Sequence, residues 1–96
     1  MGLIVETAKI RNTEIDITNV YVRLQYVALA DGINCMVNLT GYPSKELYTT
    51  LKQVETNIDP NLRVTCGEGQ VQDLLTVHEL VKTALEGKGF TVTIDL

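Results

Sequence analysis

Apolar and polar residues alternate with a period of two over much of the chain, which is the pattern of β-strands with one buried face. The longest such stretch begins at Ile17 and alternates regularly from Val20 to Leu29. A second stretch runs from Ile33 to Tyr42. Asp31-Gly32 stands between them and is typical of two-residue type I′ turns, because both residues tolerate a positive φ. The sequence therefore predicts one long β-hairpin.

The predicted turn also fixes which residues face one another across the hairpin. Counting back from it pairs Tyr26 with Val37 and Leu24 with Leu39. These pairs bring the apolar residues of both strands to one face, and a shift of one residue would separate them. We therefore expect these four side chains in the core.

Shorter segments predict the remaining elements. Alternating residues indicate strands at 3–10, 62–66 and 90–96. A helix is expected from Asp73, a typical N-cap residue, to Gly87, which would end it in the left-handed conformation. Its apolar face is broad: Leu74, Val77, Leu80, Val81, Ala84 and Leu85.

Residues 45–58 fit two interpretations. Helical spacing relates Leu47, Leu51, Val54 and Ile58, whereas Tyr48-Thr49-Thr50 favours a strand, and helix is the slightly better fit. The 96 residues make one domain, 1–96, of the α+β class. We expect a mainly antiparallel β-sandwich or small barrel with a long hairpin and one packed C-terminal helix.

Few residues could carry chemistry. The formal net charge of −4 argues against non-specific nucleic-acid binding, which needs a surplus of basic side chains. The chain has a single serine, Ser44, and a single histidine, His78, in different predicted elements, so no nucleophile stands beside a base. Cys35 and Cys66 fall on the inward phase of their strands and are expected to be reduced and buried.

We therefore predict that the protein is not an enzyme and has no catalytic residues, metal or cofactor. Gly67-Glu68-Gly69 precedes a helix as phosphate-binding loops do, but Glu68 and Asp73 place negative charge where an anion would bind. The apolar run at residues 1–5 ends at Glu6, too early for a membrane span.

The second face of the hairpin is apolar near its turn, where Val27 is paired with Met36. Either another part of the same domain covers this face, or the tip reaches into a neighbouring subunit. The second interpretation predicts a protein interface made by residues around the turn and on that face: Tyr21, Val27, Leu29, Asp31, Gly32 and Met36.

Several segments together resemble small virion proteins of tailed bacteriophages, especially the crAss-like phages. They are Ala8-Lys9-Ile10-Arg11, residues 14–17, Val20-Tyr21-Val22-Arg23, and the C-terminal helix with residues 89–94. The resemblance implies a subunit of the head-to-tail connector or tail, in a ring around the DNA channel. Rings of this type commonly use a β-sandwich or barrel with a flanking helix and a long hairpin that contacts the next subunit.

Two functions remain. The first is a structural assembly protein that forms a ring-like homo-oligomer with other virion proteins as neighbours, located in the virion after assembly in the cytoplasm of the bacterial host. The second is a small protein-binding or regulatory module that acts as a monomer or dimer. The molecular mass in solution would separate them.

Overall fold

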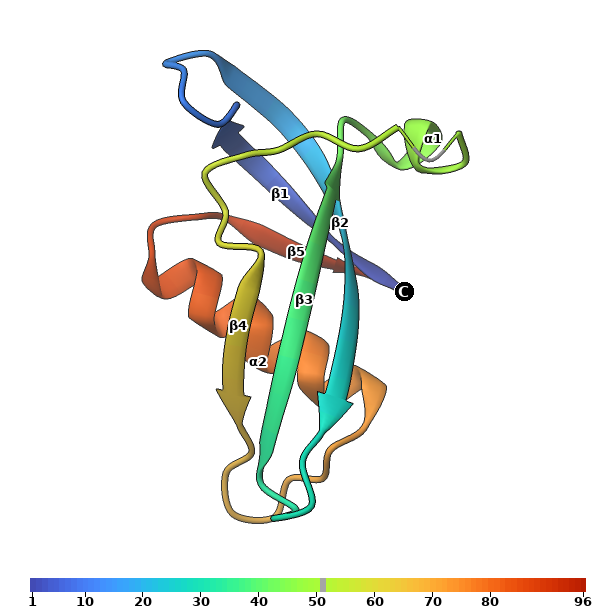
Figure 1. Ribbon diagram of the computed structural model, residues 1–96, viewed down its shortest axis with the longest axis vertical. Helices are drawn as coiled ribbons and strands as arrows, with labels where there is room; N and C mark the ends of the chain where they lie inside the picture. The colour runs from blue at the N-terminus through green and yellow to red at the C-terminus, as the bar shows by residue number, and fades with distance from the viewer. Residues whose placement is uncertain (51) are drawn as a thin grey trace.

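The computed structural model describes residues 1–50 and 52–96 and shows one antiparallel sheet with the strand order β4-β3-β2-β1-β5. The strands are β1 (Gly2–Lys9), β2 (Asp16–Ala28), β3 (Asn34–Tyr42), β4 (Asn61–Thr65) and β5 (Val92–Asp95). The helices are α1 (Lys45–Tyr48) and α2 (Leu74–Gly87). Figure 1 shows α2 crossing behind β2, β3 and β4, so it covers one face of the sheet. The α+β class with a mainly antiparallel sheet is confirmed, whereas a sandwich or barrel is not confirmed, since the described strands belong to one five-stranded sheet.

The β2–β3 hairpin has the predicted register. Tyr26 lies opposite Val37, and Leu24 lies opposite Leu39. Val37 and Leu39 are buried, while their partners on β2 are half-buried and pack against the core. The expected core face is therefore correct, but in these two pairs the residue on β3 is more deeply buried than its partner on β2.

The turn of this hairpin is longer than predicted. The last backbone bond joins the Leu29 N–H to the Asn34 carbonyl at 2.9 Å, which leaves a four-residue loop. Within it the Gly32 N–H donates to the Leu29 carbonyl at 3.2 Å. Gly32 has a φ of 75°, whereas Asp31 does not have a positive φ, so the type I′ turn was a wrong prediction. The register is unchanged because the loop is centred on the same two residues.

The core lies between the sheet and α2. The helix contributes Val77, His78, Val81 and Leu85, all buried, and the sheet contributes valines and leucines from β1, β2 and β3. Leu74 was expected on this buried face but is exposed, since the first turn of α2 lies past β2 near the hairpin tip (Figure 1).

The ends of α2 follow known capping patterns. Asp73 is the N-cap, as predicted, and its carboxylate accepts the Thr76 N–H at 2.8 Å. The left-handed residue at the other end is Gly89, with a φ of 97°, and not Gly87. The Phe90 N–H donates to the Leu85 carbonyl at 3.2 Å, the bond of a Schellman motif.

The segment after β3 is helical for only one turn. Ser44 is the N-cap of α1, and its hydroxyl accepts the Leu47 N–H at 3.2 Å. Leu51, part of the predicted helical stripe, lies outside the described residues. From Lys52 to Glu55 the chain is neither helix nor strand, so the preference for a helix over 45–58 was wrong for most of that range.

Residues 54–57 instead bond to two strands. The Val54 N–H donates to the Gly41 carbonyl at 2.9 Å, and the Arg11 N–H donates to the Glu55 carbonyl at 3.0 Å. This segment therefore joins the end of β3 to the chain just after β1, and these partners satisfy its backbone in place of helical bonds.

Candidate protein-docking surface

The tip of the β2–β3 hairpin is fastened to the connection between β4 and α2. The Gln72 side-chain amide donates to the carbonyls of Leu29, at 3.2 Å, and Asn34, at 2.7 Å. The Cys66 N–H donates to the Ile33 carbonyl at 2.8 Å. Hairpin tip, connection and the start of α2 therefore form one end of the molecule together (Figure 1).

Asp31 shapes the turn itself. Its Oδ1 accepts the N–H groups of Ile33 and Asn34 at 2.8 and 2.9 Å, and its Oδ2 accepts the Asn34 side-chain amide at 2.6 Å. These donors stabilise the ionised carboxylate and lower the pKa of Asp31 to about 2. Asp31 and Gly32, both predicted as interface residues, thus hold the loop conformation.

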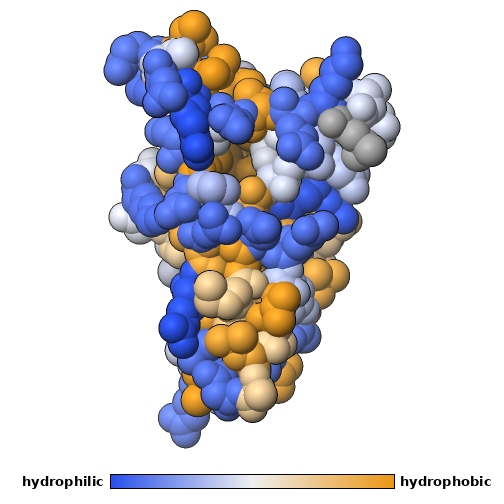
Figure 2. All heavy atoms as spheres, viewed as in Figure 1, coloured by the Kyte–Doolittle hydropathy of each residue, from blue (hydrophilic) through white to orange (hydrophobic). Residues whose placement is uncertain are grey.

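Exposed apolar side chains gather at this end. Val27 is 65% exposed and Met36 is 47% exposed, and the two lie opposite one another on the face away from α2. Figure 2 shows apolar side chains on the lower part of this face, over the tip half of the hairpin. Together with the half-buried Leu29 and the exposed side chains of the neighbouring loops and of α2 they form what we call the tip surface: Val27, Leu29, Ile33, Met36, Val71, Leu74 and Leu75.

Only part of the tip surface was predictable. The alternation in the hairpin indicated Val27, Leu29 and Met36. Ile33 and Val71 lie in loops, where no periodicity marks them. Leu74 and Leu75 stand in the first turn of α2, where the apolar spacing of the helix favoured burial.

Tyr21 was predicted in the interface, but its own chain covers it. It is only 3% exposed, and its ring centroid lies 5.5 Å from that of Tyr48 in α1. Gly2 lies under the ring, where an added Cβ would stand 2.7 Å from Tyr21 atoms. The Tyr48 ring also contacts Tyr42, at 4.9 Å, and the Arg23 guanidinium, at 5.0 Å. We therefore exclude Tyr21 from the tip surface.

The two halves of this face thus differ. Around Tyr21 the domain provides its own cover, which was the first of the two interpretations. Around Val27 and Met36 none of the described elements covers the apolar side chains, so the first interpretation fails there and contact with a neighbouring subunit stays a prediction.

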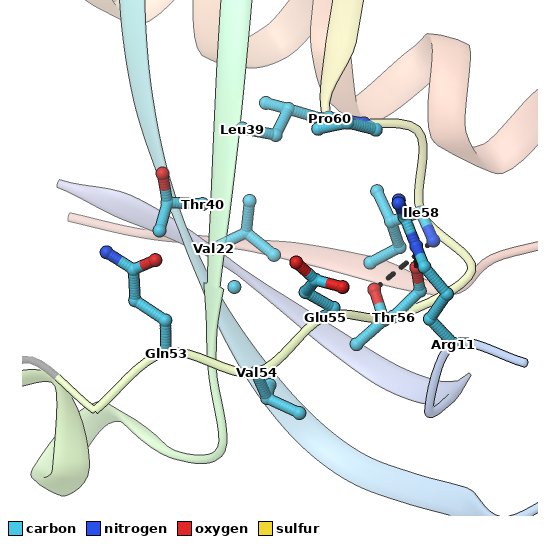
Figure 3. Close-up of a pocket in the computed structure, with 11 residues that line it drawn as sticks. Arg11, Val22, Leu39, Thr40, Gln53, Val54, Glu55, Thr56, Ile58 and Pro60 are labelled. Carbon is cyan, nitrogen blue, oxygen red and sulfur yellow. Dashed lines mark hydrogen bonds between the residues drawn. The ribbon is translucent and has the colours of Figure 1, made fainter.

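A small hollow lies where residues 53–60 cross toward β1 (Figure 3). Its volume is about 180 Å³, below the ~300–1,000 Å³ typical of ligand pockets. The Arg11 side chain donates to the Thr56 carbonyl at 3.4 Å, within the chain itself. Among the described residues that line the hollow there is no serine, cysteine or histidine. We assign the hollow to the packing of the crossing segment.

The residues considered for chemistry have structural roles. Ser44 caps α1, as described above. His78 is buried on α2, with its Nδ1 2.7 Å from the Leu74 carbonyl. Among residues 1–50 and 52–96, no three side chains of His, Cys, Asp or Glu are grouped as metal ligands would be.

Cys35 and Cys66 are free and buried, as predicted for their positions, and burial raises the pKa of the Cys35 thiol. We expect that replacing both with Ala preserves folding and assembly. The expected cost in the free energy of unfolding is about 0.5–1.5 kcal/mol per site, as for one deleted methyl group. Chemical denaturation and sedimentation of the double variant would measure this. Rapid labelling of both native thiols by a bulky reagent would contradict the burial.

None of the helices in the described part of the chain is long and apolar enough to span a membrane. Comparison with protein-family models found no match. Comparison with curated proteins and with solved structures also found none. The resemblance to phage virion proteins is thus untested by these comparisons.

Proposed function

We propose that the protein is a structural assembly subunit that binds copies of itself through the tip surface. The proposed assembly is a ring in the connector or tail of a tailed bacteriophage. The observation that supports self-assembly is the clustering of exposed apolar side chains. Among the described residues nine large hydrophobic side chains are exposed, and six of them belong to the tip surface: Val27, Ile33, Met36, Val71, Leu74 and Leu75.

Burial of the tip surface against a neighbouring subunit would stabilise the protein. A domain of about this length buries only roughly 60–70% of the surface of its unfolded chain, so further burial between subunits adds stability that the domain lacks alone. Each Å² of apolar surface removed from water contributes about 25 cal/mol. In a symmetric assembly the same contact is repeated at every subunit.

The charge is compatible with a ring around DNA. A net charge of −4 supplies no basic surplus to retain the phosphate backbone, and a passage for DNA should not bind it tightly. On this proposal the protein is located in the virion, and its other neighbours are virion structural proteins.

The alternative is a small binding module that uses the same tip surface for a different protein. Such a module would be a monomer or a dimer in solution. Sedimentation equilibrium over a range of concentrations separates the two functions, because only the assembly subunit forms larger closed oligomers.

Val27→Asp tests the role of the tip surface directly. Because the side chain is mostly exposed, we expect the circular dichroism spectrum and the melting temperature to stay close to wild type. In the subunit contact the introduced carboxylate would be buried without a partner charge. Assembly should therefore be lost in analytical ultracentrifugation.

Ile15→Asp is the matched control. Ile15 is 60% exposed but stands outside the tip surface, before β2, so this variant should assemble as wild type does. Normal assembly of Val27→Asp would exclude the tip surface as a subunit contact. A wild-type protein that stays monomeric at all concentrations would exclude the assembly function.

A further inference from the structure

The sheet has two free edges, of which β4 is the first. The Leu39 N–H donates to the Pro60 carbonyl and the Cys66 N–H donates to the Ile33 carbonyl, both at 2.8 Å. In an antiparallel pair only every second residue directs its backbone N–H and C=O groups to the partner strand. The even-numbered residues of β4 therefore bond to β3. The backbone N–H and C=O groups of Arg63 and Thr65 therefore point away from the sheet.

The second free edge is β5. The Glu6 N–H donates to the Thr91 carbonyl at 2.9 Å, so the odd-numbered residues of β5 bond to β1. The backbone groups of Val92 and Ile94 therefore point outward. A hollow lies beside this edge, lined by β5 and by α2 residues that include Glu79 and Thr83.

Counted through the twisted sheet, the two edge strands have the same sense. All four neighbouring pairs are antiparallel and the sheet has five strands, so the direction is inverted four times between β4 and β5. If β5 of one copy lay beside β4 of the next, the two strands would be parallel and α2 would stay on the same face of the joined sheets. Such a head-to-tail contact can repeat around a closed ring.

The side chains of the two edges are complementary. Arg63 lies opposite Met36, which lies opposite Val27, so Arg63 is on the face away from α2. Asp95 lies opposite Gly2 and forms an ion pair with Lys45 of α1 at 2.7 Å, which places it on the same face.

The opposite face is apolar at both edges. Leu62 and Val64 of β4 pack against the core from that side, as Val92 and Ile94 of β5 do. A register with Asp95 beside Arg63 therefore places Ile94 beside Leu62, so charge meets opposite charge and apolar meets apolar.

We propose that β5 of one copy adds to β4 of the next copy as a parallel strand, with Asp95 beside Arg63. This contact rests on the self-assembly proposed above and specifies which strands pair between copies. A two-fold pairing of β4 with β4 centred on Arg63 would instead bring two Arg63 side chains together, which is unfavourable. The barrel expected from the sequence would then be formed by several copies.

This contact is continuous with the tip surface. Val27, Met36 and Arg63 form one row across β2, β3 and β4. The neighbour's Asp95 extends that row and brings α1, attached through Lys45, to the face that exposes Met36 and Val27. One interface thus uses both the free edge and the outer apolar part of the tip surface.

Disulfide mapping tests the pairing. Asn61 and Thr93 are exposed, share the face of Arg63, and lie side by side across the proposed junction. In a background with Cys35→Ala and Cys66→Ala, Asn61→Cys chains mixed with Thr93→Cys chains should give a crosslinked heterodimer on oxidation. A chain that carries both changes should give a ladder of covalent oligomers.

A charge exchange gives an independent test. Arg63→Asp and Asp95→Arg should each weaken self-association at least fivefold, and the double variant should recover it, because the pair is restored at every junction. Lys52→Glu, a charge change at an exposed residue outside both edge strands, should have no effect.

The outcomes separate this proposal from the proposed function. Crosslinks only between identical positions, or a double charge variant without recovery, would overturn the β5–β4 junction. If Val27→Asp still abolished assembly in that case, the tip surface would remain supported as a subunit contact. A monomeric wild type without any crosslink would overturn both.

Discussion

Leu39→Ala should lower the free energy of unfolding by about 2–5 kcal/mol, the range for a large aliphatic side chain removed from a core. Leu39 is 7% exposed and belongs to the central cluster of the domain. Leu24 lies opposite it on β2 but is only half-buried, so Leu24→Ala should cost less. Urea denaturation of both variants would measure the difference.

The melting temperature gives a second measurement. In a domain of this size 1 kcal/mol corresponds to about 4–8 °C, so Leu39→Ala should melt at least ~8 °C below wild type. Ile15→Ala, a truncation of an exposed side chain, is the control and should stay within about 0.5 kcal/mol of wild type. A Leu39→Ala protein that melts within a degree or two of wild type would contradict the core position of this residue.

The hairpin register was predictable because two local signals agree. The turn dipeptide and the alternation of apolar residues each specify the same pairing, and both act between residues close in sequence. The turn conformation was less predictable, because the Asp31 carboxylate binds two backbone N–H groups and favours a longer loop.

Residues 45–58 show where sequence patterns fail. The helical spacing of Leu47, Val54 and Ile58 was real, but the backbone of this segment bonds to Gly41 and to the chain after β1. Those partners are distant in sequence, and no local pattern specifies them. Tertiary hydrogen bonds thus override a weak helical preference.

The candidate site was predicted only in part, because local patterns do not specify contacts between residues that are distant in sequence. Alternation within the hairpin indicated Val27 and Met36, which the structure exposes. It could not show that Tyr48, from a separate element, covers Tyr21. Nor could it show that Val71 and Leu74 lie at the tip, since the bonds from Gln72 place that connection there.

His78 is the buried ionisable group with the clearest consequence for stability. It is 1% exposed, and its Nε2 is buried without a hydrogen-bond partner among the described residues. Burial lowers the pKa of His78, with the positive charge of Arg23 acting in the same direction, while the Leu74 carbonyl opposes the shift. The folded protein therefore favours the neutral imidazole.

Acidification should consequently destabilise the fold. In the unfolded chain His78 takes up a proton near pH 6.5, whereas in the folded chain it does so only at lower pH. Between these two pKa values the unfolded state holds more protons, so its free energy falls relative to the folded state. Stability should be fully present above pH 6.5 and decline below it by up to about 1.4 kcal/mol per pH unit.

His78→Leu isolates this contribution. The variant keeps an apolar side chain of similar size in the core and removes the titrating group, so it should be at least as stable as wild type at pH 7. Asp31, Asp73 and Asp95 also have lowered pKa values, but these carboxylates titrate below about pH 4 and are common to both proteins. The difference in unfolding free energy between variant and wild type should therefore grow as the pH falls from 7 to 5. A difference that stays constant over this range would show that the imidazole is accessible to protons in the folded state.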